Sequence, residues 1–217
     1  MRIILASQSP RRRELLERMG VAEFDIIPAQ GEEVMDPSLS PDRLVEELSR
    51  QKCAEVAAAH PDGLVIAADT VVSVGGLVLG KPHSREEAVR MLSALSGREH
   101  MVYTGVTLFS GGRTATEHEA TSVRFRPLSQ GDIDHYLATG EPMDKAGAYG
   151  IQGYGSVLIE GISGDYYNVM GLPVCRLGRM LARFGVDTLS MAAKKEEGAW
   201  KICFAGMGSC WSSSPCC

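Results

Sequence analysis

The feature that most constrains the fold lies at the start of the chain, where an apolar strand pattern runs directly into a helix. Residues 2–6 are almost entirely apolar and predict a short buried strand. Ser9 favours the N-cap position, and Pro10 suits the first helical turn because its missing N–H group costs nothing there. Apolar residues then recur at helical spacing up to Met19, and Gly20 predicts the end of the helix. A strand followed at once by a helix is typical of a layered α/β fold.

The turn between this strand and helix gathers groups that bind anions. It combines the free N–H groups of the helix start, the hydroxyls of Ser7 and Ser9, and three consecutive arginines at residues 11–13. Such a helix start attracts phosphates above all other anions. Arg12 precedes the apolar positions of the helix at helical spacing and should lean toward its buried side, whereas Arg13 should face outward. The alternative for an arginine run taken alone is a solvated basic helix start.

Composition limits the class of protein. With 217 residues, of which 44% are hydrophobic, the chain can bury one full core or two small ones. A net charge of −5 argues against broad binding to nucleic acid, whose backbone an acidic protein repels. No apolar run has the length of a bilayer span, and the first residues lack the apolar region of a signal peptide. We therefore expect a cytoplasmic protein without a membrane partner.

The end of the chain differs in composition from the rest. Strand and helix patterns stop at about residue 190, and four of the six cysteines crowd the last fifteen residues without a Cys-x-x-Cys pair. This spacing is poor for a zinc site. We expect one domain over residues 1–190 and a disordered, reduced, cysteine-rich tail over residues 191–217. Cys53 and Cys175 are expected to be ordinary buried thiols.

Strand and helix patterns alternate along the body of the chain, as in α/β proteins. Strands are predicted at residues 24–28, 64–68, 100–109 and 116–125, a Gly-Gly hairpin at 71–79, and helices at 41–59, 84–97, 129–139 and from 173 onward. Seven glycines fall between residues 147 and 171. Such a density of glycine predicts tight turns and a loop that lines a ligand cleft.

Asp69 is the second candidate for chemistry, after the turn that leads into the first helix. It directly follows the apolar run 64–68, so the pattern places its carboxylate at the end of a buried strand. An unpaired charge is costly there, and strand ends are where open α/β sheets bind ligands. The alternative is an aspartate that caps a turn. Lys81 closes the following hairpin and should return beside Asp69, where a metal ion and a phosphate would complement both residues.

A third candidate is the segment 141–153, which combines acids, a lysine, an amide and several glycines. The amide of Gln152 offers a donor and an acceptor together, which matches the O4 and N3–H edge of uracil or thymine. An ordinary polar loop is the alternative.

Five motifs together resemble a known family, and they run in the family's order from Arg2 to about Val186. The motifs are Ser7-x-Ser9-Pro10-Arg11-Arg12, Ala68-Asp69-Thr70, Gly80-Lys81-Pro82, Leu95-Ser96-Gly97-Arg98-x-His100 and the run at residues 140–153 that ends in Gly150-Ile151-Gln152-Gly153. They resemble the Maf family of nucleoside triphosphate pyrophosphatases, also called septum formation inhibitors. The resemblance implies an α/β fold similar to that of ITPases, with an elongated, strongly bent mixed sheet flanked by helices and a cleft between two lobes. It also implies a divalent metal cation (Mg²⁺ or Mn²⁺), a homodimer, and hydrolysis between the α and β phosphates.

The resemblance further assigns roles to individual residues. Asp69 matches the family's catalytic base, and Glu33 and Asp69 match its metal ligands. The phosphate contacts fall on Ser7, Arg12, Arg13, Lys52 and Lys81, and the specificity positions fall on Arg12, Thr70 and Gln152. With glutamine at position 152, the chain resembles the subgroup that hydrolyses dTTP and UTP, including modified pyrimidine nucleotides, in cleaning the nucleotide pool.

Two alternatives stay open at this stage. One is a pyrophosphatase for a modified purine nucleotide such as N7-methyl-GTP. The other is a nucleotide-binding regulator of cell division that performs no hydrolysis. Release of pyrophosphate separates the second from an enzyme, and a ranking of nucleotides separates the first.

Overall fold

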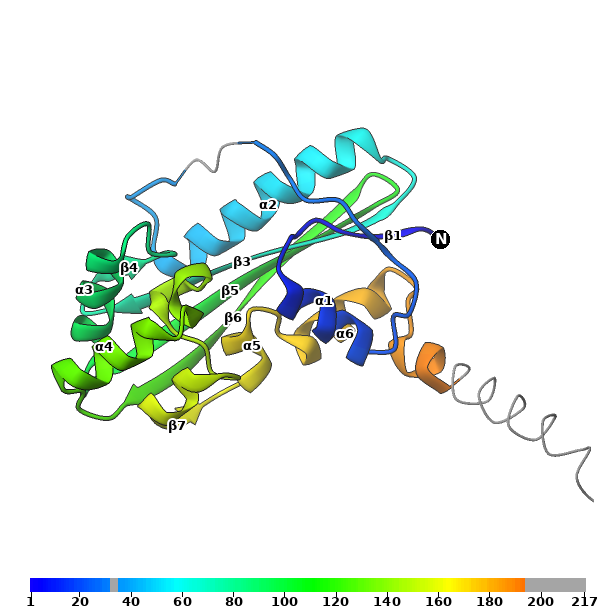
Figure 1. The fold of residues 1–217 in the computed structure, drawn as a ribbon. Helices are drawn as coiled ribbons and strands as arrows, with labels where there is room; N and C mark the ends of the chain where they lie inside the picture. The colour runs from blue at the N-terminus through cyan, green and yellow to red at the C-terminus, as the bar shows by residue number, and fades with distance from the viewer. Residues whose placement is uncertain (32–34, 194–217) are drawn as a thin grey trace, which may run out of the picture.

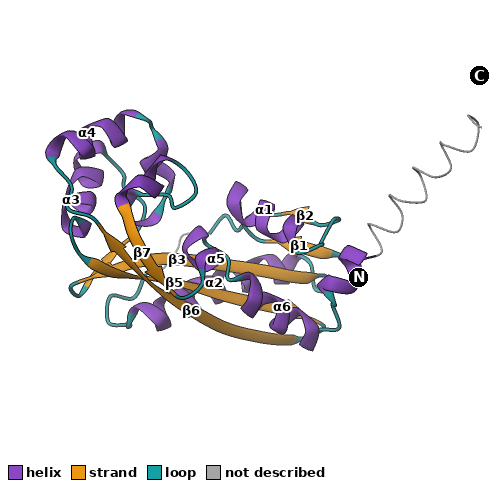
Figure 2. Ribbon diagram, turned by 90° about the horizontal axis from the view of Figure 1, so that it is seen from below, coloured by secondary structure: helices purple, strands orange, loops and turns teal. Residues whose placement is uncertain are grey.

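The computed structural model describes residues 1–31 and 35–193 of the chain. Its described part contains a seven-stranded mixed sheet with helices on both faces (Figure 1). The strands β3 (Leu64–Val74), β5 (Glu99–Ser110) and β6 (Arg113–Phe125) run through the length of the molecule and curve along their course (Figure 2). The elongated, bent α/β sheet implied by the resemblance is therefore confirmed.

The arrangement of strands around β3 leaves part of one edge open. The sheet order is β2-β1-β3-β5-β6-β7, where β2 is Asp25–Ile26, and β4 (Leu77–Leu79) also pairs with β3. On one edge, β1 (Ile3–Leu5) runs parallel to residues 64–66 of β3, and β4 runs antiparallel to residues 72–74. Within the described chain, residues 67–71 have no strand partner on that edge. The gap lies where β1 has ended and the chain has turned into α1.

The course of β3 corrects one expectation. The sequence pattern ended this strand at Ala68 and placed Asp69 just beyond it, but β3 continues without a break to Val74. The reason is its other edge, which pairs with β5 at every residue from Val65 to Ser73. Asp69 therefore lies in the middle of a strand, beside the gap in the sheet, and the turn-capping alternative is wrong.

Helices cover both faces of the sheet at β3. The helix α2 (Pro41–Ala59) lies along one face, and α1 (Pro10–Arg18), α5 (Tyr166–Met170) and α6 (Val174–Arg183) cover the other (Figure 1). Val65 and Ala67 pack into the cluster under α2, while Leu64, Ile66 and Ala68 pack into the cluster with α1 and α6. Burial on both faces explains why this stretch of β3 is apolar at every position.

A glycine sets the distance between α2 and the sheet. Gly105 lies opposite Asp69 in the pairing of β3 with β5. A Cβ atom at Gly105 would lie 2.1 Å from the carbonyl oxygen of Val45 in α2. Only glycine therefore lets the helix backbone approach this closely, next to the strand position that carries Asp69.

The second lobe lies at the other end of the long strands (Figure 2). It contains the helices α3 (Arg85–Leu95) and α4 (Gln130–Ala138), the 3₁₀ turns η1 (Glu141–Asp144), η2 (Ala146–Ala148) and η3 (Tyr154–Leu158), and the strand β7 (Ile159–Ser163). Its core includes Leu92, Phe125 and Tyr149. The glycine-rich pattern concealed β7 and α5, which lie inside the stretch that we expected to be turns and loop.

The described chain ends shortly after the predicted domain boundary. Residues 188–193 are helical, and Met191 packs against the core of the first lobe. Residues 191–193, which we expected to belong to the disordered tail, are thus part of this helix. The rest of the predicted tail, from residue 194 onward, lies outside the described residues, together with its four cysteines. Cys53 is buried as expected, whereas Cys175 is exposed because it lies on the outer side of α6. No helix in the described ranges combines the length and the apolar character of a bilayer span.

Candidate active site

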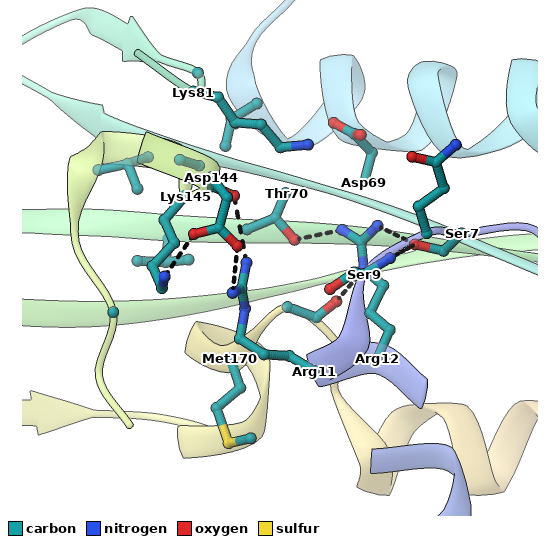
Figure 3. Close-up of a pocket in the computed structure, with 18 of the residues that line it drawn as sticks. Ser7, Ser9, Arg11, Arg12, Asp69, Thr70, Lys81, Asp144, Lys145 and Met170 are labelled. Atoms are coloured by element: carbon teal, nitrogen blue, oxygen red, sulfur yellow. Dashed lines mark hydrogen bonds and ion pairs between the residues drawn. The ribbon is translucent and has the colours of Figure 1, made fainter. Parts of the chain in front are cut away.

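A cleft of about 890 Å³ opens beside the unpaired edge of β3 and is lined by both lobes (Figure 3). One side, which we call the sheet wall, consists of Ser7, Arg12, Lys52, Asp69 and Thr70. The opposite side belongs to residues 141–155, which we call the loop wall and which contribute Gln152. Lys81, at the end of the β4 hairpin, also lines the cleft. Seven predicted site residues thus come together from distant parts of the sequence.

Asp69 and Lys52 form an ion pair at the base of the sheet wall. The alternation of β3 directs Asp69 toward α2, and Lys52 extends from that helix to meet its carboxylate. Their side chains are only 12% and 17% exposed, respectively. The sequence had placed Lys81 beside Asp69, but among the described contacts Lys52 takes this position, because α2 packs directly over β3.

Arg12 holds the turn before α1 against the rest of the sheet wall. Its Nε donates to the carbonyl oxygen of Gly171 at 2.8 Å, and its two terminal nitrogens donate to Ser7 Oγ at 3.2 Å and Thr70 Oγ1 at 3.1 Å (Figure 3). Thr70 Oγ1 lies 2.9 Å from Thr104 Oγ1 on β5. Arg12 therefore leans toward the buried side of α1, as its helical position predicts, and links α1 to β3 and to the end of α5.

The other two arginines differ in a way that the sequence only partly indicated. Arg13 is not among the residues that line the cleft, and it pairs at the surface with Glu17 at 2.9 Å. Arg11, which the sequence placed in the anion-binding run without an individual role, does line the cleft and pairs with Asp144 of the loop wall at 2.9 Å. The four-residue spacing between Arg13 and Glu17 was the available signal, because such pairs meet on the outer face of a helix.

Asp144 holds a second cleft-lining cation besides Arg11. Lys145 Nζ lies 2.6 Å from Asp144 Oδ1 and 2.6 Å from the carbonyl oxygen of Glu141. Burial raises the pKa of Asp144, but the contacts with Lys145 and Arg11 outweigh it, and the pKa is lowered overall. The carboxylate is thus ionised at neutral pH.

Among the residues that the structure describes, the lining of the cleft carries more cations than carboxylates. These cations are Arg11, Arg12, Lys52, Lys81 and Lys145, and these carboxylates are Asp69, Glu87 and Asp144. A concave site with more cations than anions focuses a positive potential and favours polyanions. This agrees with the phosphate-binding character predicted from the first turn of the chain.

Gln152 lies on an exposed turn of the loop wall, between η2 and η3. Behind it, Tyr149 is buried with its hydroxyl 2.8 Å from His100 Nε2, and both rings pack edge-to-face against Phe125. Burial lowers the pKa of His100 to about 4, so the imidazole is neutral at pH 7. The aromatic cluster therefore supports the loop wall from within the second lobe.

The residues at the cleft are compatible with a divalent cation that arrives with a polyphosphate. The described chain has no group of three or more histidine, cysteine or acidic side chains that could hold a metal by themselves. Mg²⁺ is commonly bound by one or two carboxylates together with substrate phosphates, and Asp69 provides one such carboxylate. Glu33, the other predicted ligand, lies outside the described residues.

The fold and the cleft define an α/β protein that can hold a polyanion between two lobes of one bent sheet. The family model described as Maf-like protein matches residues 2–184, and the chain belongs to this family.

Relatives of known name agree with this assignment. A dTTP/UTP pyrophosphatase of Bacillus velezensis is 50% identical over 185 residues, which cover 85% of this chain and 97% of the relative. A dTTP/UTP pyrophosphatase of Symbiobacterium thermophilum is 52% identical over 183 residues, which cover 84% of this chain and 94% of the relative. Among solved structures, a HAM1 protein from Coxiella burnetii aligns with a TM-score of 0.51 at 16% identity, covering 84% of this chain and 99% of that one. That likeness concerns the fold alone.

Proposed function

We propose that this protein is a nucleoside triphosphate pyrophosphatase that hydrolyses dTTP and UTP to the monophosphate and pyrophosphate. The observation that carries the proposal is the sheet wall, where a carboxylate and several cations converge beside an open strand edge. Relatives about 50% identical over most of the chain are named dTTP/UTP pyrophosphatases, which supports the same substrates.

The charges of the cleft suit a triphosphate. A nucleoside triphosphate carries about four negative charges at neutral pH, since its terminal phosphate has a second pKa near 6. Arg12, Lys52 and Lys81 would bind the phosphates from the sheet side, and Arg11 and Lys145 would approach from the loop side. Fixed cations in such a site stabilise the charge that develops on the departing pyrophosphate.

Asp69 would act on the attacking water. Its carboxylate would orient the water and accept a proton as the oxygen attacks the α phosphorus, while the bond between that phosphorus and the α–β bridging oxygen breaks. The ion pair with Lys52 fixes the direction of the carboxylate. Catalysis of this kind depends mainly on position and charge, and the rigid β3–β5 pairing supplies the position.

A divalent metal cation would complete the charge balance. Asp69 would hold Mg²⁺ or Mn²⁺ together with Glu33 and phosphate oxygens, and the ion would neutralise part of the triphosphate charge.

Ser7 and Arg13 remain phosphate contacts by resemblance; Ser7 lines the cleft, and Arg13 pairs with Glu17 on the outer face of α1. We also propose that the protein acts in the cytoplasm as a homodimer and binds no nucleic acid.

Gln152 would select the base. Its amide would pair with both O4 and N3–H of a uracil or thymine ring. The two bases differ by one methyl group, which a hydrophobic pocket distinguishes only modestly. Thr70 and Arg12 would complete the specificity set from the sheet wall.

A substrate panel tests this function. Initial rates of pyrophosphate release are measured with dTTP, UTP, CTP and N7-methyl-GTP, each with Mg²⁺ and with Mn²⁺. We expect dTTP and UTP to be the best substrates and N7-methyl-GTP to be poor, because a second ring and a positive charge fit badly beside Arg12. A clear preference for N7-methyl-GTP contradicts the pyrimidine assignment, and nucleotide binding without pyrophosphate release contradicts an enzymatic role.

A further inference from the structure

Glu141 lies just outside the cleft, at the start of η1, and it gathers several hydrogen bonds from the loop wall. Its Oε1 accepts from the Tyr136 hydroxyl at 2.8 Å and from the backbone N–H of Gly155 at 3.1 Å. Its Oε2 accepts from the backbone N–H of Tyr154 at 2.7 Å. One carboxylate thus binds three donors, two of them from backbone that follows Gln152.

The same group also reaches the backbone that precedes Gln152. The N–H of Gly150 donates to the Tyr136 hydroxyl at 3.0 Å, and this hydroxyl donates to Glu141. The turn at residues 151–153 is therefore fixed on both sides by one carboxylate and one phenol. Glu141 itself is not among the residues that line the cleft.

The packing around this carboxylate leaves little room for another arrangement. A Cβ atom at Gly153 would lie 2.1 Å from Glu141 Oε2. A Cβ atom at Gly155 would lie 2.5 Å from the carbonyl oxygen of Gly150 and 2.7 Å from the Tyr136 hydroxyl oxygen. Glycine is thus required at position 155, where a Cβ atom would meet backbone, and any larger residue at position 153 would displace the Glu141 carboxylate.

The charge of Glu141 strengthens these contacts. Burial raises its pKa, but hydrogen bonds from Gly155, Tyr136 and Tyr154 outweigh burial and lower the pKa overall. Hydrogen bonds to an ionised acceptor are roughly twice as strong as those between neutral groups. The side chain is therefore an ionised acceptor for all three donors at neutral pH.

We propose that Glu141 is a positioning residue for base selection, which fixes the turn that presents Gln152 without touching the substrate. The identity of the base rests on the function proposed above. The catalytic carboxylate and the sheet-wall cations are held by β3, α2 and α1 instead. A defect at Glu141 should therefore affect nucleoside recognition and leave the phosphate contacts of the sheet wall intact.

The test is Glu141→Gln, which keeps the length of the side chain but replaces one acceptor oxygen with an NH₂ group. That group faces a donor and leaves at least one of the three hydrogen bonds unmade. Tyr136→Phe is the second variant, because it removes one hydroxyl without changing volume appreciably. Glu160→Gln is the matched control, since Glu160 lies on β7 and pairs with Arg124 at the surface.

Each variant is measured by KM and kcat for dTTP, the preference for dTTP over CTP, and inhibition by inorganic pyrophosphate, which probes the phosphate half of the site. For Glu141→Gln we expect KM for dTTP to rise about 10–100-fold, with kcat changed by less than about threefold. The dTTP preference should shrink, and the inhibition constant of pyrophosphate should stay within about twofold of the wild-type value. Tyr136→Phe should show the same pattern more weakly, and Glu160→Gln should match the wild type.

Amide hydrogen exchange of residues 146–158 in the absence of nucleotide provides an independent readout. Exchange there should become faster in Glu141→Gln and Tyr136→Phe but not in Glu160→Gln. Equal weakening of dTTP and pyrophosphate binding, or unchanged exchange in this segment, overturns the positioning role alone. A wild-type protein that hydrolyses none of the pyrimidine triphosphates overturns the proposed function, and the base-selection role with it.

Discussion

The two walls of the cleft are built by different means. The sheet wall takes its residues from long, paired strands and from helices that pack directly on them. The backbone at Asp69 is held by the pairing of β3 with β5. The loop wall has no strand or α-helix at Gln152, and it depends on short 3₁₀ turns fixed by Glu141 and Tyr136. The backbone of the sheet wall should therefore keep its conformation after a single substitution, because it shares the rigidity of the sheet. The conformation of the loop wall depends on a few side chains, so that substituting one of them can alter it.

This difference separates two tasks within one site. Chemistry at phosphate needs groups fixed by a rigid support, because small displacements of catalytic groups are costly. Base selection needs a pocket whose lining can differ while the chemistry remains the same. The loop wall meets that need at Gln152, which lies on an exposed turn between η2 and η3 and not on β3. Variants of the two walls should consequently fail in different ways.

The largest effect is expected at the centre of the sheet wall. Asp69→Asn keeps the shape of the side chain but removes the charge and the base, so hydrolysis of dTTP should fall about 10²–10⁴-fold. The fold should survive, because the β3–β5 pairing uses backbone groups. Steady-state kinetics and thermal melting measure the two outcomes.

Asp134→Asn is the matched control for Asp69, since Asp134 pairs with Arg85 at the surface of the second lobe. It should retain wild-type turnover. Turnover near the wild-type rate in Asp69→Asn would remove this residue from the mechanism, and with it the view that the sheet wall performs the chemistry.

Arg12 should show the next largest effect. Arg12→Ala removes a cation from the cleft and breaks the links from α1 to Thr70 and Gly171, so kcat/KM for dTTP should fall about 10²-fold. Inhibition by pyrophosphate should weaken as well, which distinguishes this variant from Glu141→Gln on the loop wall.

Arg18→Ala provides the comparison on the same helix. Arg18 pairs with Glu14 on the exposed side of α1. Surface pairs of this kind contribute little, so its kinetic constants should stay within about twofold of the wild type. Equal kinetic losses in Arg12→Ala and Arg18→Ala would show that Arg12 acts only through general surface charge and not through a specific contact in the cleft.

The smallest effect concerns the support of the loop wall. His100 has a pKa lowered by burial from 6.5 to about 4, so the folded state binds its proton less readily than the unfolded chain does. The neutral imidazole of His100 contributes fully to the stability of the fold above pH 6.5. This contribution is lost as the pH falls to about 4, because the unfolded chain then binds the proton more readily. The linked loss in the free energy of unfolding is about 2–3 kcal/mol.

His100→Gln isolates the part of the free energy of unfolding that depends on the protonation of His100. Glutamine retains an acceptor for Tyr149 but does not titrate. The difference in the free energy of unfolding between wild type and variant, measured by urea denaturation at pH 7 and pH 4.5, should become smaller at the lower pH. A difference that is independent of pH would show that His100 is not held neutral in the fold. Hydrogen exchange at pH 4.5 should report earlier loosening of the loop wall than of β3.

Much of the fold could be predicted because the signals were local. Pro41–Ala59 forms a helix over the predicted range, and the Gly75–Gly76 hairpin and the strands around Gly111 lie where the pattern placed them. The prediction failed at β3, because apolar periodicity ends at Asp69 whereas the strand does not. A charged residue at a buried strand position needs a partner such as Lys52, and that partner comes from a helix earlier in the chain.

The sequence by itself determined which types of side chain are available to bind a polyphosphate and to act on it. The helix start with its serines and arginines, the acid after an apolar run, and the amide in a glycine-rich segment can all be recognised locally. Only the tertiary structure decided their arrangement: Lys52 rather than Lys81 pairs with Asp69, Arg11 rather than Arg13 lines the cleft, and Glu141 fixes the turn of Gln152. The physical reason is that these choices depend on strand pairing and helix packing between distant segments. Local spacing indicated that Arg13 faces outward, but it carries no information about contacts between segments that are distant in the sequence.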